Sequence, residues 1–113
     1  MIIDLDDVLG RIQGDKELLV ELIEIFLDDC PQKVSEIKKC FEISDFGQLS
    51  ELSHSIKGAA ANIGAKKISY TFLQAEEAAN SQNIDGFGQL IERMDQEFDE
   101  LTQYFPELKI KLA

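Results

Sequence analysis

The chain has 113 residues, 44% of them hydrophobic, and a formal net charge of −11 at pH 7. This length suits one compact domain and leaves no room for two. Because binding to phosphate groups needs clustered Lys and Arg, the acidic balance argues against nucleic acid and anionic membranes as partners and favours a protein partner.

The chain carries no signal for entry into a membrane or a secretory route. No hydrophobic stretch approaches the roughly 20 residues that a spanning helix needs. The N-terminus, MIIDLDDVLG, has no basic region. We therefore expect a cytoplasmic protein. Cys30 and Cys40 would stand about 15 Å apart along one predicted helix, so no disulfide is expected between them.

Apolar residues recur at helical spacing along most of the chain. A short helix is predicted over residues 4–11, and Asp15 is the expected N-cap of the helix that follows. That long amphipathic helix is predicted over residues 15–42, where apolar residues follow one another in steps of three and four. Pro31 should kink or split it, because the proline ring removes a backbone donor and clashes with the preceding turn.

The segment ISDFGQ predicts a turn, with Ser44 or Asp45 as the N-cap of the next helix. This helix runs to about Ile63, and Gly64 is a natural residue just beyond its C-terminus. A further helix is predicted over residues 66–80 and is ended by NSQNIDG.

The last long helix carries an apolar stripe from Phe87 to Phe105, until Pro106 disturbs it. Four long amphipathic helices joined by short turns must bury their stripes against one another. We predict an all-α fold, an antiparallel four-helix bundle with a short additional N-terminal helix, as a single domain over residues 1–113. A monomer is expected because all four stripes are used inside the bundle. No glycine-rich phosphate loop follows a strand, so no nucleotide site is expected.

The only histidine, His54, lies in the segment SHSIKGAAANIGA. When residues 45–63 are projected at about 100° per residue, the apolar side chains share one arc and His54 lies about 140° from its centre. Lys57 and Gly58 share the outer face with it. A glycine in the middle of a helix costs about 1 kcal/mol relative to alanine. Its presence on a solvent face indicates that something approaches the backbone closely.

An exposed histidine on a helix is most often an ordinary solvated residue, and two chemical roles for His54 are poorly supported. Glu51 and His54 have the Glu-x-x-His spacing of di-iron bundles, but those sites need two such pairs projecting inward. No metal site is therefore expected. Ser53 and Ser55 point about 100° to either side of His54, which argues against a hydrolytic Ser–His–acid set.

The third role is that of a nucleophile. A histidine ring is substantially neutral at pH 7, and its free nitrogen can attack a phosphoryl group. Lys57 would offset the arriving charge, and Gly58 would leave room for the group and for a partner's active site. Phosphoryl transfer depends mostly on positioning and charge neutralisation, so an exposed residue can serve.

The residues His54-Ser55-Ile56-Lys57-Gly58, followed by Gly64-Ala65 and an apolar Ile68, resemble the signature of histidine-containing phosphotransfer (HPt) domains. The usual pattern of that family is His-x-(Leu/Ile)-Lys-Gly, five residues, then Gly. The resemblance extends over nearly the whole chain. The second helix of the family resembles the segment GDKELLVELIEIFLDDCPQKVSEIKK. The frequent Leu-Glu-x-Ala of the family resembles the segment AEEAA, in which Ala75 stands in place of Leu.

The resemblance implies a phosphoryl carrier of a two-component phosphorelay. His54 would accept a phosphoryl group from the phospho-aspartate of a response-regulator receiver domain and pass it to another receiver. Lys57 would be the supporting cation, Gly58 the steric gap, and Glu76 a polar neighbour of the imidazole. The chain would need no cofactor or kinase activity of its own, since the receiver's acidic cluster would hold the Mg²⁺.

A docking surface for the receiver is expected around His54. A transient relay partner calls for a small interface, of roughly 1,200 Å² or less. The predicted docking residues are Ser50, Ser55, Ala61, Asn62, Lys66, Val8, Leu9 and Ile12.

Two other functions stay open at this point: a helical adaptor without phosphotransfer, and the phosphorylated N-terminal domain of a chemotaxis-type kinase. A hybrid sensor histidine kinase is a further potential partner. The Met1 start and the final KIKLA favour a free-standing protein over a domain of such a kinase.

Overall fold

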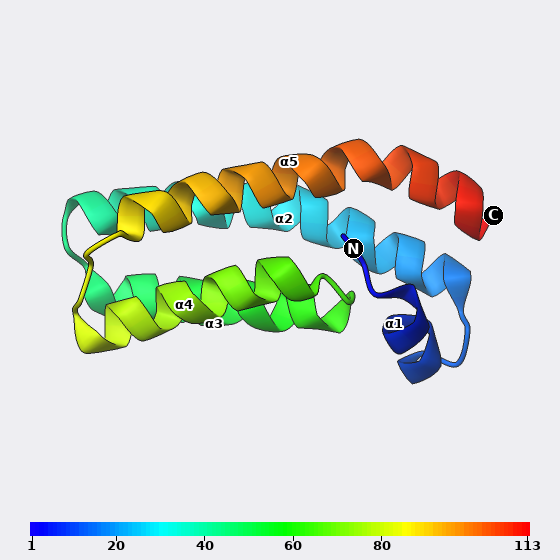
Figure 1. Ribbon diagram of the computed structural model, residues 1–113, viewed down its shortest axis with the longest axis horizontal. Helices are drawn as coiled ribbons and strands as arrows, with labels where there is room; N and C mark the ends of the chain where they lie inside the picture. Colours follow the sequence, from blue (N-terminus) through cyan, green and yellow to red (C-terminus); the bar gives the residue numbers. More distant parts are fainter.

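Five helices follow one another in the computed structural model, which describes residues 1–113 (Figure 1). They are α1 (Leu5–Arg11), α2 (Lys16–Glu42), α3 (Phe46–Asn62), α4 (Lys66–Ser81) and α5 (Phe87–Leu112). The helices α2 to α5 run alternately in opposite directions and pack side by side. The prediction of an antiparallel four-helix bundle with a short additional N-terminal helix is confirmed.

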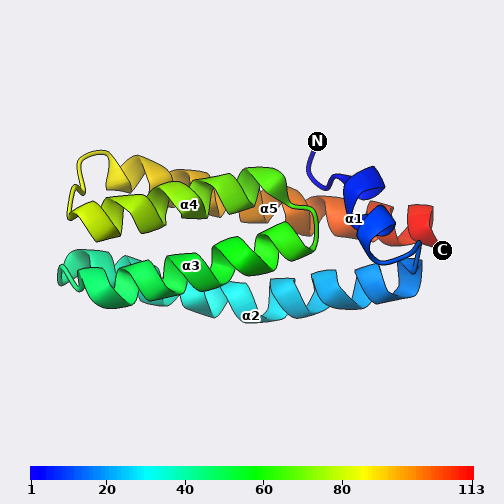
Figure 2. The same cartoon turned by 90° about the horizontal axis from the view of Figure 1, so that it is seen from below.

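The four long helices form two layers, with α3 beside α4 and α2 beside α5 (Figures 1 and 2). Helix α3 packs against both α2 and α4. Its outer face is therefore bordered by one helix on each flank. At one end, α2 and α5 extend past the α3–α4 pair, and α1 lies against this end of the bundle (Figure 2).

Three aspartates cap the first three helices. The capping residues are Asp4, Asp15 and Asp45. Each carboxylate accepts a hydrogen bond from the backbone N–H of the residue three positions further along the chain. Such a cap stabilises a helix by about 1 kcal/mol. The prediction for Asp15 is confirmed, and of the two candidates for the next helix Asp45 is the cap. Ser44 instead lies in the turn, with a φ of 58°.

Both prolines lie inside continuous helices. Helix α2 is not split at Pro31, and the prediction that Pro106 disturbs the last helix is wrong, because α5 continues to Leu112. A proline removes its own N–H bond from the ladder and crowds the preceding turn, but the other hydrogen bonds of the helix can form. Beyond Pro106, Leu108 is fully buried and Leu112 nearly so. Their burial stabilises the turns that follow the proline.

One hydrophobic core runs through the bundle and contains 24 buried apolar residues. Phenylalanines from three helices meet in it. The ring of Phe98 on α5 stacks on Phe26 of α2 at 5.3 Å and meets the edge of Phe72 of α4 at 6.0 Å. These contacts hold α2, α4 and α5 together behind α3. None of the helices has both the length and the apolar character needed to cross a membrane.

Cys30 and Cys40 are free, as the helical spacing predicts, and both are buried. Burial raises the pKa of the Cys30 thiol to about 11. Because the thiolate is the reactive form, Cys30 is an inert core residue.

The turn between α3 and α4 is clamped against α1. Gly64 has a φ of 78°, and a Cβ there would lie 3.1 Å from the carbonyl oxygen of Asp4 and 3.2 Å from the Cβ of Val8. The backbone N–H of Asp4 donates to the carbonyl of Gly64 at 2.9 Å. Glycine is needed here for both its conformation and its size.

Candidate functional site

The two faces of α3 differ as the helical projection predicts. Leu49, Leu52, Ser53, Ile56 and Ala60 are buried. On the opposite face, the His54 side chain is 67% exposed.

The imidazole of His54 is held by a carboxylate from the neighbouring helix. Glu76 on α4 places one carboxylate oxygen 2.7 Å from Nδ1 of His54 and the other 2.6 Å from Nζ of Lys57. This contact is possible because α4 runs antiparallel to α3 beside this face. Glu76 therefore bridges the histidine and the lysine of the predicted site.

The electrostatics of the bridge keep Glu76 ionised. The hydrogen bond from Lys57 lowers the pKa of Glu76 most, and the hydrogen bond from His54 lowers it further against an opposing contribution from burial. An ionised carboxylate only accepts hydrogen bonds, so Nδ1 of His54 carries the proton. In the neutral ring, Nε2 is then the nitrogen with the free lone pair.

Lys57 and Gly58 complete the exposed face. The side chain of Lys57 is 26% exposed, and its ammonium forms an ion pair with Glu76. At Gly58, an added Cβ would meet no atom within 4 Å. Packing inside the chain therefore does not require a glycine at this position, and the space above the backbone is open.

Neither of the alternative chemistries finds its residues in place. The Ser53 hydroxyl is buried without a hydrogen-bond partner, and that of Ser55 accepts from Lys33, so neither hydroxyl forms a hydrogen bond with His54. No group of three or more His, Cys, Asp or Glu side chains is placed to hold a metal ion.

The predicted docking residues beside His54 are tied to neighbouring helices. Ser50 donates a hydrogen bond of 2.6 Å to the side-chain oxygen of Asn80 on α4. Ser55 accepts a bond of 3.0 Å from Lys33 on α2. Asn62 is exposed and lines a narrow groove between α2 and α3.

Two further predicted docking residues lie where α1 meets α3 and α4. The carbonyl of Ala61 accepts a hydrogen bond of 2.9 Å from the guanidinium of Arg11. Lys66 forms an ion pair with Asp4 at 2.9 Å. The hydrogen bond from Lys66 lowers the pKa of Asp4 and that from the backbone N–H of Asp7 lowers it further.

The structure corrects one docking residue. Val8 is completely buried, in contact with the α3–α4 turn at Gly64, and offers no surface to a partner. It faces inward because α1 packs its apolar side against the bundle. Leu9 and Ile12 are partly buried and also pack against the core, which leaves only part of each side chain accessible.

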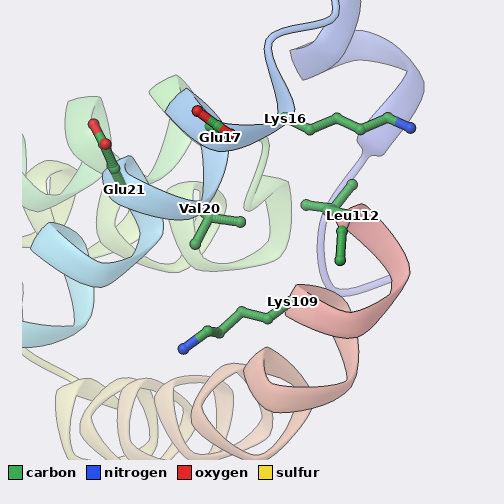
Figure 3. Close-up of a pocket in the computed structure, with 7 residues that line it drawn as sticks. Lys16, Glu17, Val20, Glu21, Lys109 and Leu112 are labelled. Carbon is green, nitrogen blue, oxygen red and sulfur yellow. The ribbon is translucent and has the colours of Figure 1, made fainter.

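Another hollow, of about 310 Å³, lies between the first turns of α2 and the last turns of α5 (Figure 3). Val20 and Leu112 form its apolar walls, and charged side chains of both signs surround them. It shares no residue with the His54 site. We assign it no role in the chemistry of that site.

The sequence pattern does not indicate two of the cations that lie near the site. Lys33 on α2 and Arg11 on α1 both reach α3 from other helices. In the sequence, both residues lie on polar helix faces, and such faces are expected to be exposed to solvent. Only the packing of α2 and α1 against α3 shows that they border the face of His54.

Fold and site together define a helical bundle that presents one histidine to solvent, with its Nδ1 held by a carboxylate. The chain belongs to the Hpt domain family, which matches residues 21–104. The resemblance seen in the sequence is thereby confirmed.

Phosphotransfer proteins from plants are among the relatives of this chain. The chain is 23% identical over 91 residues to histidine-containing phosphotransfer protein 2 of Arabidopsis thaliana, covering 78% of this chain and 58% of the relative. It is 26% identical over 108 residues to histidine-containing phosphotransfer protein 1 of rice, covering 89% and 74%. The chain thus spans less than two thirds of the Arabidopsis protein.

The fold is shared with a solved bacterial structure. Histidine-containing phosphotransfer protein B of Pseudomonas aeruginosa superposes with a TM-score of 0.85 at 24% identity, over 97% of this chain and 96% of that one. The two proteins therefore share one fold over nearly their whole length.

Proposed function

We propose that the chain is the phosphoryl carrier of a multistep His–Asp phosphorelay. His54 accepts the group from the phospho-aspartate of one receiver domain and passes it to an aspartate of another. The observation that carries the proposal is the 2.7 Å contact between Glu76 and Nδ1 of a largely exposed His54. It leaves Nε2 free as the acceptor atom.

The transfer step follows from this arrangement. The lone pair of Nε2 attacks the phosphorus atom and an N–P bond forms. The bond between phosphorus and the aspartyl oxygen breaks, and its electron pair returns to the aspartate carboxylate. Nδ1 keeps its proton, so the ring becomes an imidazolium that faces the ionised Glu76. Delivery to the second receiver is the same step in reverse.

The other site residues support the step without taking part in bond formation. Glu76 fixes the tautomer of His54 and stabilises the imidazolium, as a carboxylate does for a catalytic histidine. Lys57 supplies positive charge near the phosphoryl group. Gly58 leaves the clearance that an incoming receiver needs, which accounts for a glycine in the middle of an exposed helix.

A receiver would dock over α3 and its two flanks. The narrow groove between α2 and α3 is lined by Leu22, Ile25, Ala59 and Asn62 among others, and Ile25 is 56% exposed. Together with Ser55 this gives a small mixed surface next to His54. An interface of about 1,200 Å² or less would allow the receiver to leave after transfer.

Hpt proteins relay phosphate between histidine kinases and receivers. We propose that this chain has that role and that it acts in the cytoplasm.

The first prediction concerns uptake of label. Incubation with a ³²P-phosphorylated receiver should label the wild-type chain with an acid-labile, alkali-stable phosphohistidine, and His54→Gln should take up none. Because the chain has one histidine, this substitution removes every imidazole. Circular dichroism should show the same helical content for both proteins.

Other outcomes would point elsewhere. Labelling of His54→Gln, or no labelling of the wild type by any receiver, would refute the proposal. Labelling that requires ATP and a separate kinase domain would instead indicate the substrate domain of a chemotaxis-type kinase. An unlabelled wild type that still binds its partner after His54→Ala would indicate an adaptor.

A further inference from the structure

Lys33 reaches the exposed face of α3, which carries His54, from the side opposite Glu76. Its ammonium donates a hydrogen bond of 3.0 Å to the hydroxyl of Ser55, the residue next to His54. Helix α2 thus contributes a cation on one flank of α3, and α4 contributes a carboxylate on the other. The two flanks of the site carry opposite charge.

The two lysines at the site differ in their partners. The ammonium of Lys57 lies 2.6 Å from the Glu76 carboxylate. Lys33 has a neutral hydroxyl as its partner and forms no ion pair. Most of the positive charge of Lys57 is therefore compensated within the chain, and that of Lys33 is not.

The charge that arrives with the phosphoryl group needs a further cation. Before transfer, neutral His54, Lys57 and Glu76 together carry no net formal charge. Transfer of PO₃⁻ adds one negative charge in total, because the bound phosphoryl group is a dianion and the histidine ring becomes a cation. The new dianion lies near the carboxylate of Glu76. A second cation would return the site to neutrality.

Lys33 is suited to supply this charge. A lysine has a flexible four-carbon stem and three donors that can rotate toward a new acceptor. The present hydrogen bond joins the charged ammonium of Lys33 to the neutral hydroxyl of Ser55. A bond to a phosphoryl oxygen joins two charged groups, and the attraction between opposite charges strengthens it. Exchange of the Ser55 hydroxyl for the phosphoryl oxygen is therefore favourable.

We propose that Lys33 is a second phosphoryl-binding residue of this chain, which leaves Ser55 and binds the phosphoryl oxygens on His54. The inference rests on the proposed phosphotransfer function. Nε2 gains the N–P bond and the donor loses its P–O or P–N bond. Lys33 exchanges one hydrogen-bond acceptor for another without transfer of its own proton.

The test compares variants with two phosphoryl donors. One donor is a phosphorylated receiver, and the other is phosphoramidate, a small molecule with no protein surface. Lys33→Met removes the cation and Lys33→Arg keeps it. The charge-matched control is Lys39→Met, since Lys39 is exposed on the same helix and has no side-chain partner.

Lys33→Met should lower the equilibrium constant for formation of phospho-His54 by about fivefold with both donors, the upper range for an exposed charge pair. Lys33→Arg should stay within about twofold of the wild type, and so should Lys39→Met. The phosphorylated fraction is read from phosphate-affinity gels at a fixed ratio of donor to chain.

Three results would overturn the inference. Equal equilibrium constants for Lys33→Met and the wild type would show that Lys33 does not bind the group. An equal loss in Lys39→Met would show a general effect of net charge. A loss with the receiver but not with phosphoramidate would make Lys33 a docking residue only. A wild type that takes up no label from either donor would remove the proposed function as well, so the two failures are distinct.

Discussion

Glu76 is the residue on which the orientation of His54 depends. One carboxylate holds Nδ1 of the histidine and the ammonium of Lys57, so its loss should release both side chains at once. Glu76→Ala should lower the rate of labelling of His54 by about tenfold, the lower range for a carboxylate that orients a functional histidine. Glu76→Gln should retain part of the rate because its amide oxygen can accept from Nδ1.

The tautomer of His54 gives this prediction a second, more direct measurement. When the imidazole ring is neutral, the ¹⁵N chemical shifts of the single histidine should show the proton on Nδ1 in the wild type. In Glu76→Ala they should show a mixture of the two tautomers. The neighbouring Glu77 is exposed and has no side-chain bond to α3, so Glu77→Ala is the matched control and should keep the wild-type spectrum. Unchanged shifts in Glu76→Ala would contradict the orienting role.

At the scale of elements, the junction of α1 with the α3–α4 turn depends on one glycine. In Gly64→Ala, the left-handed backbone costs about 1–2 kcal/mol. The methyl group also comes within 3.1 Å of the Asp4 carbonyl oxygen. We expect a loss of about 2 kcal/mol in the free energy of unfolding, measured in urea. The amide of Asp4, which bonds to Gly64, should exchange faster with deuterium.

Gly88→Ala is the control for this substitution. Gly88 lies in the first turn of α5, and an added Cβ would meet nothing within 4 Å. Its replacement should leave the stability unchanged or raise it by a few tenths of a kcal/mol. Equal destabilisation in the two variants would refute the claim that α1 depends on a close approach at Gly64.

The whole fold was more accessible from the sequence than the details of the site. Helical periodicity and the capping residues Asp15 and Asp45 predict the bundle, because each depends on neighbours within one helix. The prediction at Pro106 is wrong because the burial of Leu108 in the hydrophobic core outweighs the local effect of the proline. Lys33 was missed for the same reason: its contact with Ser55 joins residues 22 positions apart.

The charge balance of the whole molecule leads to the last prediction. With a net charge of −11, an unpaired carboxylate adds to a general repulsion, whereas a paired one stabilises the fold. The pKa of Asp4 is lowered, first by the hydrogen bond from Lys66. A carboxyl with a lower pKa in the folded chain stabilises it above the unfolded pKa, and this stability is lost as pH falls through the folded value.

Asp4→Asn keeps the helix cap but loses the ion pair, so its urea midpoint should lie below that of the wild type at pH 7. The difference should shrink as the pH falls below the ordinary aspartate value of 3.8. Asp28→Asn removes the same charge from an exposed residue of α2 without a side-chain partner. Its midpoint at pH 7 should equal or exceed that of the wild type, because repulsion decreases. A lower midpoint for both variants would show that pairing at Asp4 is unimportant and that lost charge alone destabilises the bundle.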